Sequence, residues 1–101
     1  MAKVTVHMID RNHLADFYFT SEPVTKAKEY LESGLYTAMG PVDRPFEGEE
    51  AAEDMYDMSN NPRRQTIRNE YFGRMRSVSV GDIVEVDGTM FLCRPAEWVA
   101  L

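Results

Sequence analysis

"SVSVGDIVEVDGTMFLC", residues 77–93, is the stretch that decides the fold. Its valines alternate with serines up to a turn at Gly81-Asp82, after which "IVEV" has the composition of a strand. "DG" is the strongest two-residue hairpin motif, and "TMFLC" forms the returning strand. The stretch therefore predicts strands at Ile83–Val86 and Thr89–Cys93. A hairpin accounts for the whole pattern without a nucleophile, a general base or a phosphate-binding loop.

Two helices are predicted upstream of this hairpin. Residues 23–33 begin with a proline, which suits a first helical turn, and are followed by Gly34, which suits the residue after a helix. Their apolar residues fall within one third of the helical circumference. Residues 48–58 place alanines and methionines on one side and carboxylates on the other, and the early carboxylates complement the helix dipole.

Further strands are predicted before and between these helices. "KVTVHMI" alternates apolar and polar residues and predicts a strand at Val4–Ile9. A second strand is predicted at Leu35–Met39. The aromatic residues of "LADFYFT", residues 14–20, favour a further strand. "NPRRQTIRNEYFG", residues 61–73, fits either a short third helix or an ordered loop.

These elements predict a single α+β domain over residues 1–101. We expect a small, mostly antiparallel sheet with two helices, or three, packed on one face. The predicted core consists of Val4, Val6, Val24, Ala27, Leu31, Leu35, Met55, Val80, Val84, Val86, Phe91 and Cys93.

Composition narrows the biological setting. The apolar stretches are far too short to cross a bilayer and the N-terminus lacks the apolar core of a signal peptide, so we expect a cytoplasmic protein without a membrane partner. Cys93 is the only cysteine, which excludes an internal disulfide, and its apolar neighbours favour a buried thiol over a reactive one. The composition of the sequence does not indicate an oligomeric state.

The chain has a net charge of −6, and residues 1–62 alone carry −7. The acidic side of the helix at 48–58 predicts four partner-binding residues: Glu47, Glu50, Asp54 and Asp57. Carboxylates in an exposed row stay solvated and equivalent, whereas acid–base catalysis needs two environments that separate their pKa values. The row is therefore either a solubilising surface or a recognition surface that resembles nucleic-acid phosphates and docks on a basic groove of a partner protein.

Residues 63–76 form a basic segment with five arginines and one glutamate, a net charge of +4. Guanidinium groups that hold phosphates and aromatic rings that stack on bases can build a platform for single-stranded nucleic acid. The residues that would build it are Arg63, Arg64, Arg68, Tyr71, Arg74 and Arg76. The same arginines stand beside an acidic helix, however, and can pair with it inside the monomer.

Other patterns give little support for catalysis. The histidines and the aspartates near them match no closed zinc spacing: His7, Asp10, His13 and Asp16. Ser77 and Ser79 lack a visible base and a G-x-S-x-G context. The phosphate loops G-x-G-x-x-G and G-x-x-x-x-G-K-[ST] are both missing from the sequence. We therefore expect neither an enzyme nor a metal or cofactor site.

"DMSNNP" and especially "YFGRMRSVSVGDIVEVDGTMFLC" resemble a group of small proteins carried by bacteriophages and plasmids, many of them uncharacterised. That group has an N-terminal strand, an acidic helix ending in residues like "SNN", and the motif R-S-x-S-V-G-D-V-x-x-V-D-G. The resemblance covers residues 36–98 and is most specific from Arg76-Ser77 to Gly88. The chain departs from the pattern at its tail, where Trp98 replaces an expected glycine followed by an aromatic residue.

The resemblance implies a setting rather than a reaction. Small acidic proteins of mobile elements often bind host machinery, such as a defence nuclease, a restriction enzyme or an RNA polymerase. The leading hypothesis is therefore a non-enzymatic protein that binds and modulates a host protein through its acidic surface. The alternative is a small single-stranded nucleic-acid-binding or transcription-associated protein that uses residues 63–76.

Overall fold

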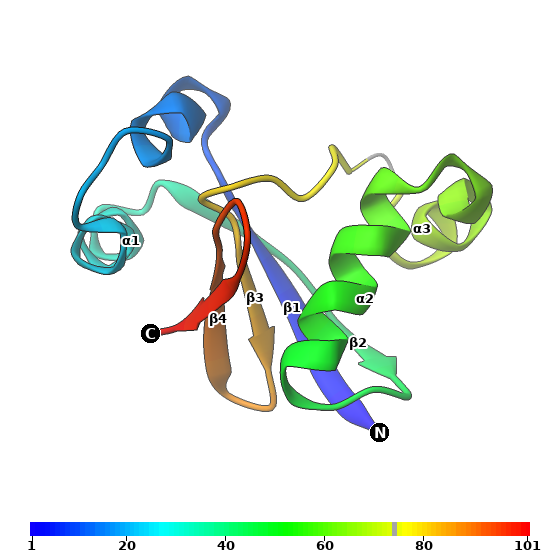
Figure 1. Cartoon of the computed structure of the whole chain (residues 1–101). Coiled ribbons are helices and arrows are strands. Elements are labelled where there is room, and N and C mark those ends of the chain that lie inside the picture. The colour runs from blue at the N-terminus through cyan, green and yellow to red at the C-terminus, as the bar shows by residue number, and fades with distance from the viewer. Residues whose placement is uncertain (74) are drawn as a thin grey trace.

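The predicted hairpin forms part of a larger sheet. In the computed structural model, which describes residues 1–73 and 75–101, five antiparallel strands have the order β2-β1-β3-β4-β5 (Figure 1). The strands are β1 (Ala2–Ile9), β2 (Tyr36–Arg44), β3 (Ile83–Val86), β4 (Thr89–Cys93) and β5 (Trp98–Ala100). The α-helices are α1 (Pro23–Glu32), α2 (Gly48–Asn60) and α3 (Gln65–Phe72), and two 3₁₀ helices are η1 (Arg11–Phe17) and η2 (Pro62–Arg64).

The turn of the β3–β4 hairpin has the geometry that its sequence predicts. Asp87 and Gly88 both have positive φ angles, +48° and +90°, as a two-residue turn between right-twisted strands requires. The Asp87 side chain also accepts a hydrogen bond from the backbone N–H of Lys3 at 2.9 Å. The hairpin is thereby fastened to the neighbouring strand β1.

The N-terminal strand β1 lies between the hairpin and β2. Val4 pairs with Val86 and Val6 with Val84, so residues near both ends of the chain meet in the middle of the sheet. On the other edge of β1 the register with β2 shifts between Val4 and Val6. Gly40 occupies this bulge with a φ of +119°, and a Cβ there would lie 2.9 Å from the Val4 carbonyl oxygen. The bulge lets β2 continue beyond the end predicted at residue 39.

Helices cover both faces of the sheet. Side chains alternate along a strand, so Val4, Val6 and Val84 point to one face while Ile9 and Ile83 point to the other. The first set packs in a core with α2, and the second packs in a separate core with η1 and α1. Figure 1 shows α1 and α2 on opposite sides of the strands. The expected packing of the helices on one face is therefore corrected to packing on both.

The first segment after β1 also differs from its prediction. Residues 14–20 do not form a strand; η1 takes up most of them, and Asp10 begins it by accepting a hydrogen bond from the N–H of Asn12 at 2.9 Å. Phe17 is fully buried, whereas Phe19 is 92% exposed. The buried Phe17 side chain therefore anchors this segment alone, whereas a strand would have buried alternate aromatic side chains.

The other predicted elements are confirmed with small changes of boundary. Both long helices form, and residues 61–73 contain η2 followed by α3. Strand β5 was not predicted. Of the predicted core, seven residues are buried: Val4, Val6, Ala27, Met55, Val84, Val86 and Cys93. The rest are half-buried: Val24, Leu31, Leu35, Val80 and Phe91. Phe17, Met58 and Leu92 are buried residues that the prediction lacked.

Candidate functional site

The most specific part of the sequence motif forms a buried ionic cluster. Asp82 is fully buried and accepts hydrogen bonds from the backbone N–H groups of Ile9 at 2.9 Å and Ser79 at 2.8 Å. The Arg76 guanidinium donates to both oxygens of the same carboxylate, at 2.6 and 2.7 Å, and to the Ile9 carbonyl at 2.8 Å. A buried charge is tolerated when it is paired and fully hydrogen-bonded. The motif therefore fastens β1 to the turn before β3, which is a structural role.

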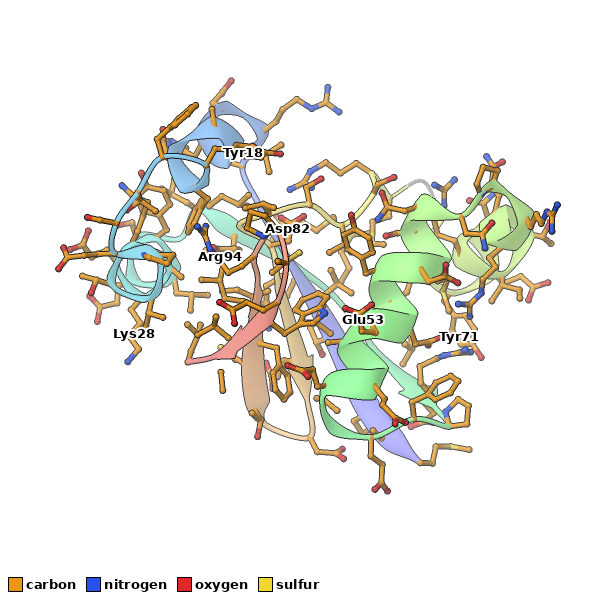
Figure 2. All side chains as sticks on the ribbon, in the orientation of Figure 1. Tyr18, Lys28, Glu53, Tyr71, Asp82 and Arg94 are labelled. Atoms are coloured by element: carbon orange, nitrogen blue, oxygen red, sulfur yellow. The ribbon has the colours of Figure 1, made fainter. Side chains whose placement is uncertain are left out.

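The glycine before this aspartate is needed for packing. Gly81 has a φ of +100°, and a Cβ at this position would lie 2.7 Å from the Phe17 ring. The Tyr36 hydroxyl donates to the Gly81 carbonyl at 2.6 Å. Aromatic side chains from η1 and β2 thus close around the turn, and Figure 2 shows Asp82 at this junction above the strands.

The described arginines of the basic segment, residues 63–76, have different structural surroundings. Arg76 belongs to the buried cluster, and Arg64 donates to Asp54 at 2.8 Å and to Asp57 at 2.9 Å. Arg63 is exposed, and Arg68 contacts the neighbouring Asn69 side chain at 3.3 and 3.4 Å. The Tyr71 ring lies under the Arg44 guanidinium, 5.4 Å from its centre. Arg74 lies outside the described residues.

Asp54 is not on the exposed acidic face where its helical position had placed it. Its side chain is only 4% exposed and is held between two arginines. Arg44 donates through Nε to Oδ2 at 2.8 Å, and Arg64 donates through Nη2 to Oδ1 at 2.8 Å. The hydrogen bond to Asp54 raises the pKa of Arg44 above its usual value. This correction removes Asp54 from the accessible set and gives it a structural role.

The remaining carboxylates of α2, together with Glu47 just before it, form an exposed surface, which we call the acidic face. It consists of Glu47, Glu49, Glu50, Glu53 and Asp57. The opposite side of α2 is buried through Ala51, Ala52, Met55 and Met58, so the helix has one orientation available to it. The Glu47 and Asp57 side chains are 80% and 56% exposed. The acidic face is therefore presented to solvent from a well-anchored helix.

Two depressions open on this side of the molecule. One, of about 460 Å³, lies along the acidic face and is lined by Phe46, Glu49, Glu50, Glu53, Asp54, Asp57 and Arg64. The other, of about 200 Å³, lies between α2 and β5 and includes Tyr56, Trp98 and Glu53 in its lining. Glu53 lines both, and Figure 2 shows it on the side of α2 that faces the strands at the front. Exposed aromatic side chains, Phe46 and Tyr56, thus accompany the carboxylates.

Sequence reasoning missed these aromatic residues. Tyr56 follows Glu53 by three positions and therefore lies on the same side of the helix, which is a sequence pattern that would have found it. Trp98 donates from its indole nitrogen to Glu53. That contact joins positions 45 residues apart and has no local sequence pattern.

The other candidate groups have structural partners. His7 Nε2 lies 2.9 Å from Glu85, and His13 Nδ1 lies 3.1 Å from Asp16. Within residues 1–73 and 75–101, no three histidine, cysteine, aspartate or glutamate side chains are placed to hold a metal ion. The Ser77 and Ser79 hydroxyls donate to backbone carbonyls rather than to a base.

The thiol of Cys93 is also unsuited to nucleophilic chemistry. Cys93 is 3% exposed, and its burial, with help from the negative charge of Asp82, raises the pKa of the thiol to about 12. The group is therefore protonated at neutral pH, and only a thiolate is an effective nucleophile.

The structure and the comparisons give no family assignment. Among the described residues, no helix combines the length and the apolar character needed to cross a membrane. Comparisons of the chain with family models, with curated proteins and with solved structures found no match.

Proposed function

We propose that this chain is a non-enzymatic protein-binding module that docks its acidic face on a basic surface of a partner protein. The observation that carries the proposal is an exposed row of carboxylates on and just before a helix whose opposite side is buried in the core: Glu47, Glu49, Glu50, Glu53 and Asp57. A rigid element preserves the spacing of these charges, so little order has to be gained on binding. Complementary charge then supplies orientation and a fast association rate.

The aromatic residues beside the acidic face strengthen the proposal. Phe46 and Tyr56 are 39% and 41% exposed, and aromatic side chains are enriched at the centres of protein interfaces. The basic surface best matched to such a face is a groove that otherwise holds nucleic-acid phosphates. In the phage or plasmid setting, the partner would be a nucleic-acid-binding host protein in the bacterial cytoplasm, such as a defence nuclease, a restriction enzyme or an RNA polymerase.

The proposal is tested by charge reversal on α2. Glu49→Lys with Glu50→Lys should reduce affinity for the captured partner roughly tenfold or more, because charges that attracted the partner would repel it. The matched control is Glu29→Lys with Glu32→Lys on α1, which makes the same change of net charge on the opposite side of the sheet. Proteins captured from a bacterial lysate by wild type and control, but lost by the α2 variant, are identified by mass spectrometry. Equal capture by all three proteins would contradict the proposal.

The alternative, binding of single-stranded nucleic acid through residues 63–76, has weaker support. Two of its arginines, Arg64 and Arg76, are already paired with Asp54 and Asp82. A salt titration with single-stranded DNA separates the two functions. Several phosphate contacts would make affinity fall steeply with salt, whereas absence of binding at low salt would eliminate this alternative.

A further inference from the structure

The smaller depression has two aromatic walls. Tyr56, on the exposed side of α2, and Trp98, at the start of β5, lie with ring centroids 6.5 Å apart and ring planes at 85°. The volume of about 200 Å³ suits a single side chain rather than a cofactor. The two rings pack edge to face on each other, and both line the same small space.

Carboxylates stand beside these rings. Glu53 accepts the indole N–H of Trp98 on Oε1, which fixes the ring and leaves Oε2 of the same carboxylate to accept from a ligand. Glu97 also lines the depression, while Val80 and the buried Cys93 contribute apolar surface. The arrangement therefore combines negative charge, aromatic faces and a surface for an aliphatic stem.

Arg94 also lines this depression, but its charge is directed elsewhere. Its Nη1 donates to the Phe17 carbonyl at 2.6 Å, at the end of η1. Figure 2 shows Arg94 on the side of the molecule near α1, and Glu53 on α2. Among the described residues the guanidinium of Arg94 forms no ion pair with Glu53, whose carboxylate accepts from Trp98 instead.

We propose that this depression binds a cationic side chain, the ammonium of a lysine or the guanidinium of an arginine. The cation lies against the Tyr56 and Trp98 rings and donates to Glu53, while its methylene groups contact Val80. The inference rests on the proposed function only for the source of the side chain, which is the basic surface of the partner. Binding of the cation itself needs no partner, so it is tested separately.

Trp98 is the only tryptophan of the chain, so its fluorescence reports on this depression alone. The probes are Nα-acetyl-arginine amide and Nα-acetyl-lysine amide, with Nα-acetyl-citrulline amide as the uncharged isostere, all at matched ionic strength. We expect at least one cationic probe to change the fluorescence with a dissociation constant in the millimolar range, and citrulline to have no effect. The arginine and lysine arms show which cation is preferred.

Two variants locate the binding. Glu53→Gln removes the charge but keeps an oxygen that can accept the indole N–H, and Tyr56→Leu removes one aromatic wall while keeping the reporter. Each should weaken binding of the preferred cation about fivefold, whereas Glu29→Gln on α1 should leave it unchanged. Thermal melts confirm that the variants are folded.

Several outcomes would overturn the inference: no response to either cation, an equal response to citrulline, or unchanged affinity in both variants. If the depression fails to bind cations while charge reversal at Glu49 and Glu50 still abolishes capture, the proposed function stands and only this inference falls. If cations bind but capture is unaffected by the reversal, the proposed function falls and the cation site stands.

Discussion

Asp82 and Asp54 are both buried and both held by arginine side chains, but their surroundings differ. Asp82 is fully buried and takes backbone N–H groups from two separate segments in addition to Arg76. Asp54 keeps 4% of its side chain exposed and is held by Arg44 and Arg64, whose own side chains are 12% and 22% exposed. The first cluster joins parts of the backbone, whereas the second joins side chains near the surface.

This difference between Asp82 and Asp54 shows that buried carboxylates have two roles in this protein. At Asp82 the carboxylate organises the turn that leads into β3, and nothing remains for a ligand. At Asp54 the carboxylate holds Arg64, which also reaches the half-exposed Asp57. Asp57 thus belongs to the acidic face but is partly neutralised by Arg64, whereas Asp54 is buried between its two arginines. An acidic residue on α2 is therefore fully available to a partner only if no arginine of β2 or η2 reaches it.

The largest effect should come from breaking the Asp82 cluster. Asp82→Ala leaves Arg76 charged and partly buried without its carboxylate and leaves the N–H groups of Ile9 and Ser79 without an acceptor. We expect a loss of about 3–5 kcal/mol in the free energy of unfolding, measured by urea denaturation. The double variant Arg76→Met with Asp82→Leu should recover part of this loss, because no unpaired charge remains. A loss below about 1 kcal/mol for Asp82→Ala would contradict the role given to the cluster.

A charge reversal on α2 should separate the buried carboxylate from an exposed one. Asp54→Lys places a third positive charge beside Arg44 and Arg64, and we expect it to destabilise the protein by about 3 kcal/mol. Glu50→Lys, four positions earlier on the same helix, should change stability by less than about 0.5 kcal/mol. Thermal denaturation of the two variants compares them directly. Similar melting temperatures would show that Asp54 is not held as described.

The smallest effect should come from removing one of the two arginines at Asp54. Arg64→Met keeps the apolar stem and leaves Asp54 paired with Arg44, so we expect a loss of about 1 kcal/mol or less. The measurement is again urea denaturation, with Arg63→Met, an exposed neighbour, as the control. A loss as large as that of Asp82→Ala would mean that the two clusters are equally structural.

Much of the fold was predictable because its periodicity is local. The hairpin, both long helices and the N-terminal strand follow from alternation, helical spacing and turn residues. The two-sided burial of the sheet also has a sequence pattern: adjacent apolar pairs such as Ile83–Val84 and Leu92–Cys93 place buried side chains on both faces of a strand. The prediction of a strand at residues 14–20 was wrong because aromatic residues favour strands only where a partner strand is available.

The candidate site was less predictable because its decisive contacts are long-range. The acidic side of α2 follows from helical spacing, but the burial of Asp54 depends on Arg44, contributed by an adjacent strand whose extent was underestimated. The hydrogen bond from Ile9 to Asp82 spans 73 residues. The indole of Trp98 reaches Glu53 only because β5 extends the sheet beyond β4. Pairings of this kind are set by topology, which one sequence does not specify.

The central place of β1 has a consequence for how the protein is made. Its Val4–Val86 and Val6–Val84 pairings and the Ile9–Asp82 bond become available only when residues 82–86 have left the ribosome. Until then the first strand exposes an apolar face and one unpaired edge, which are features that chaperones and proteases recognise. Folding of the sheet should therefore wait for the synthesis of β3, with a rate limited by closing the long loop between β1 and β3.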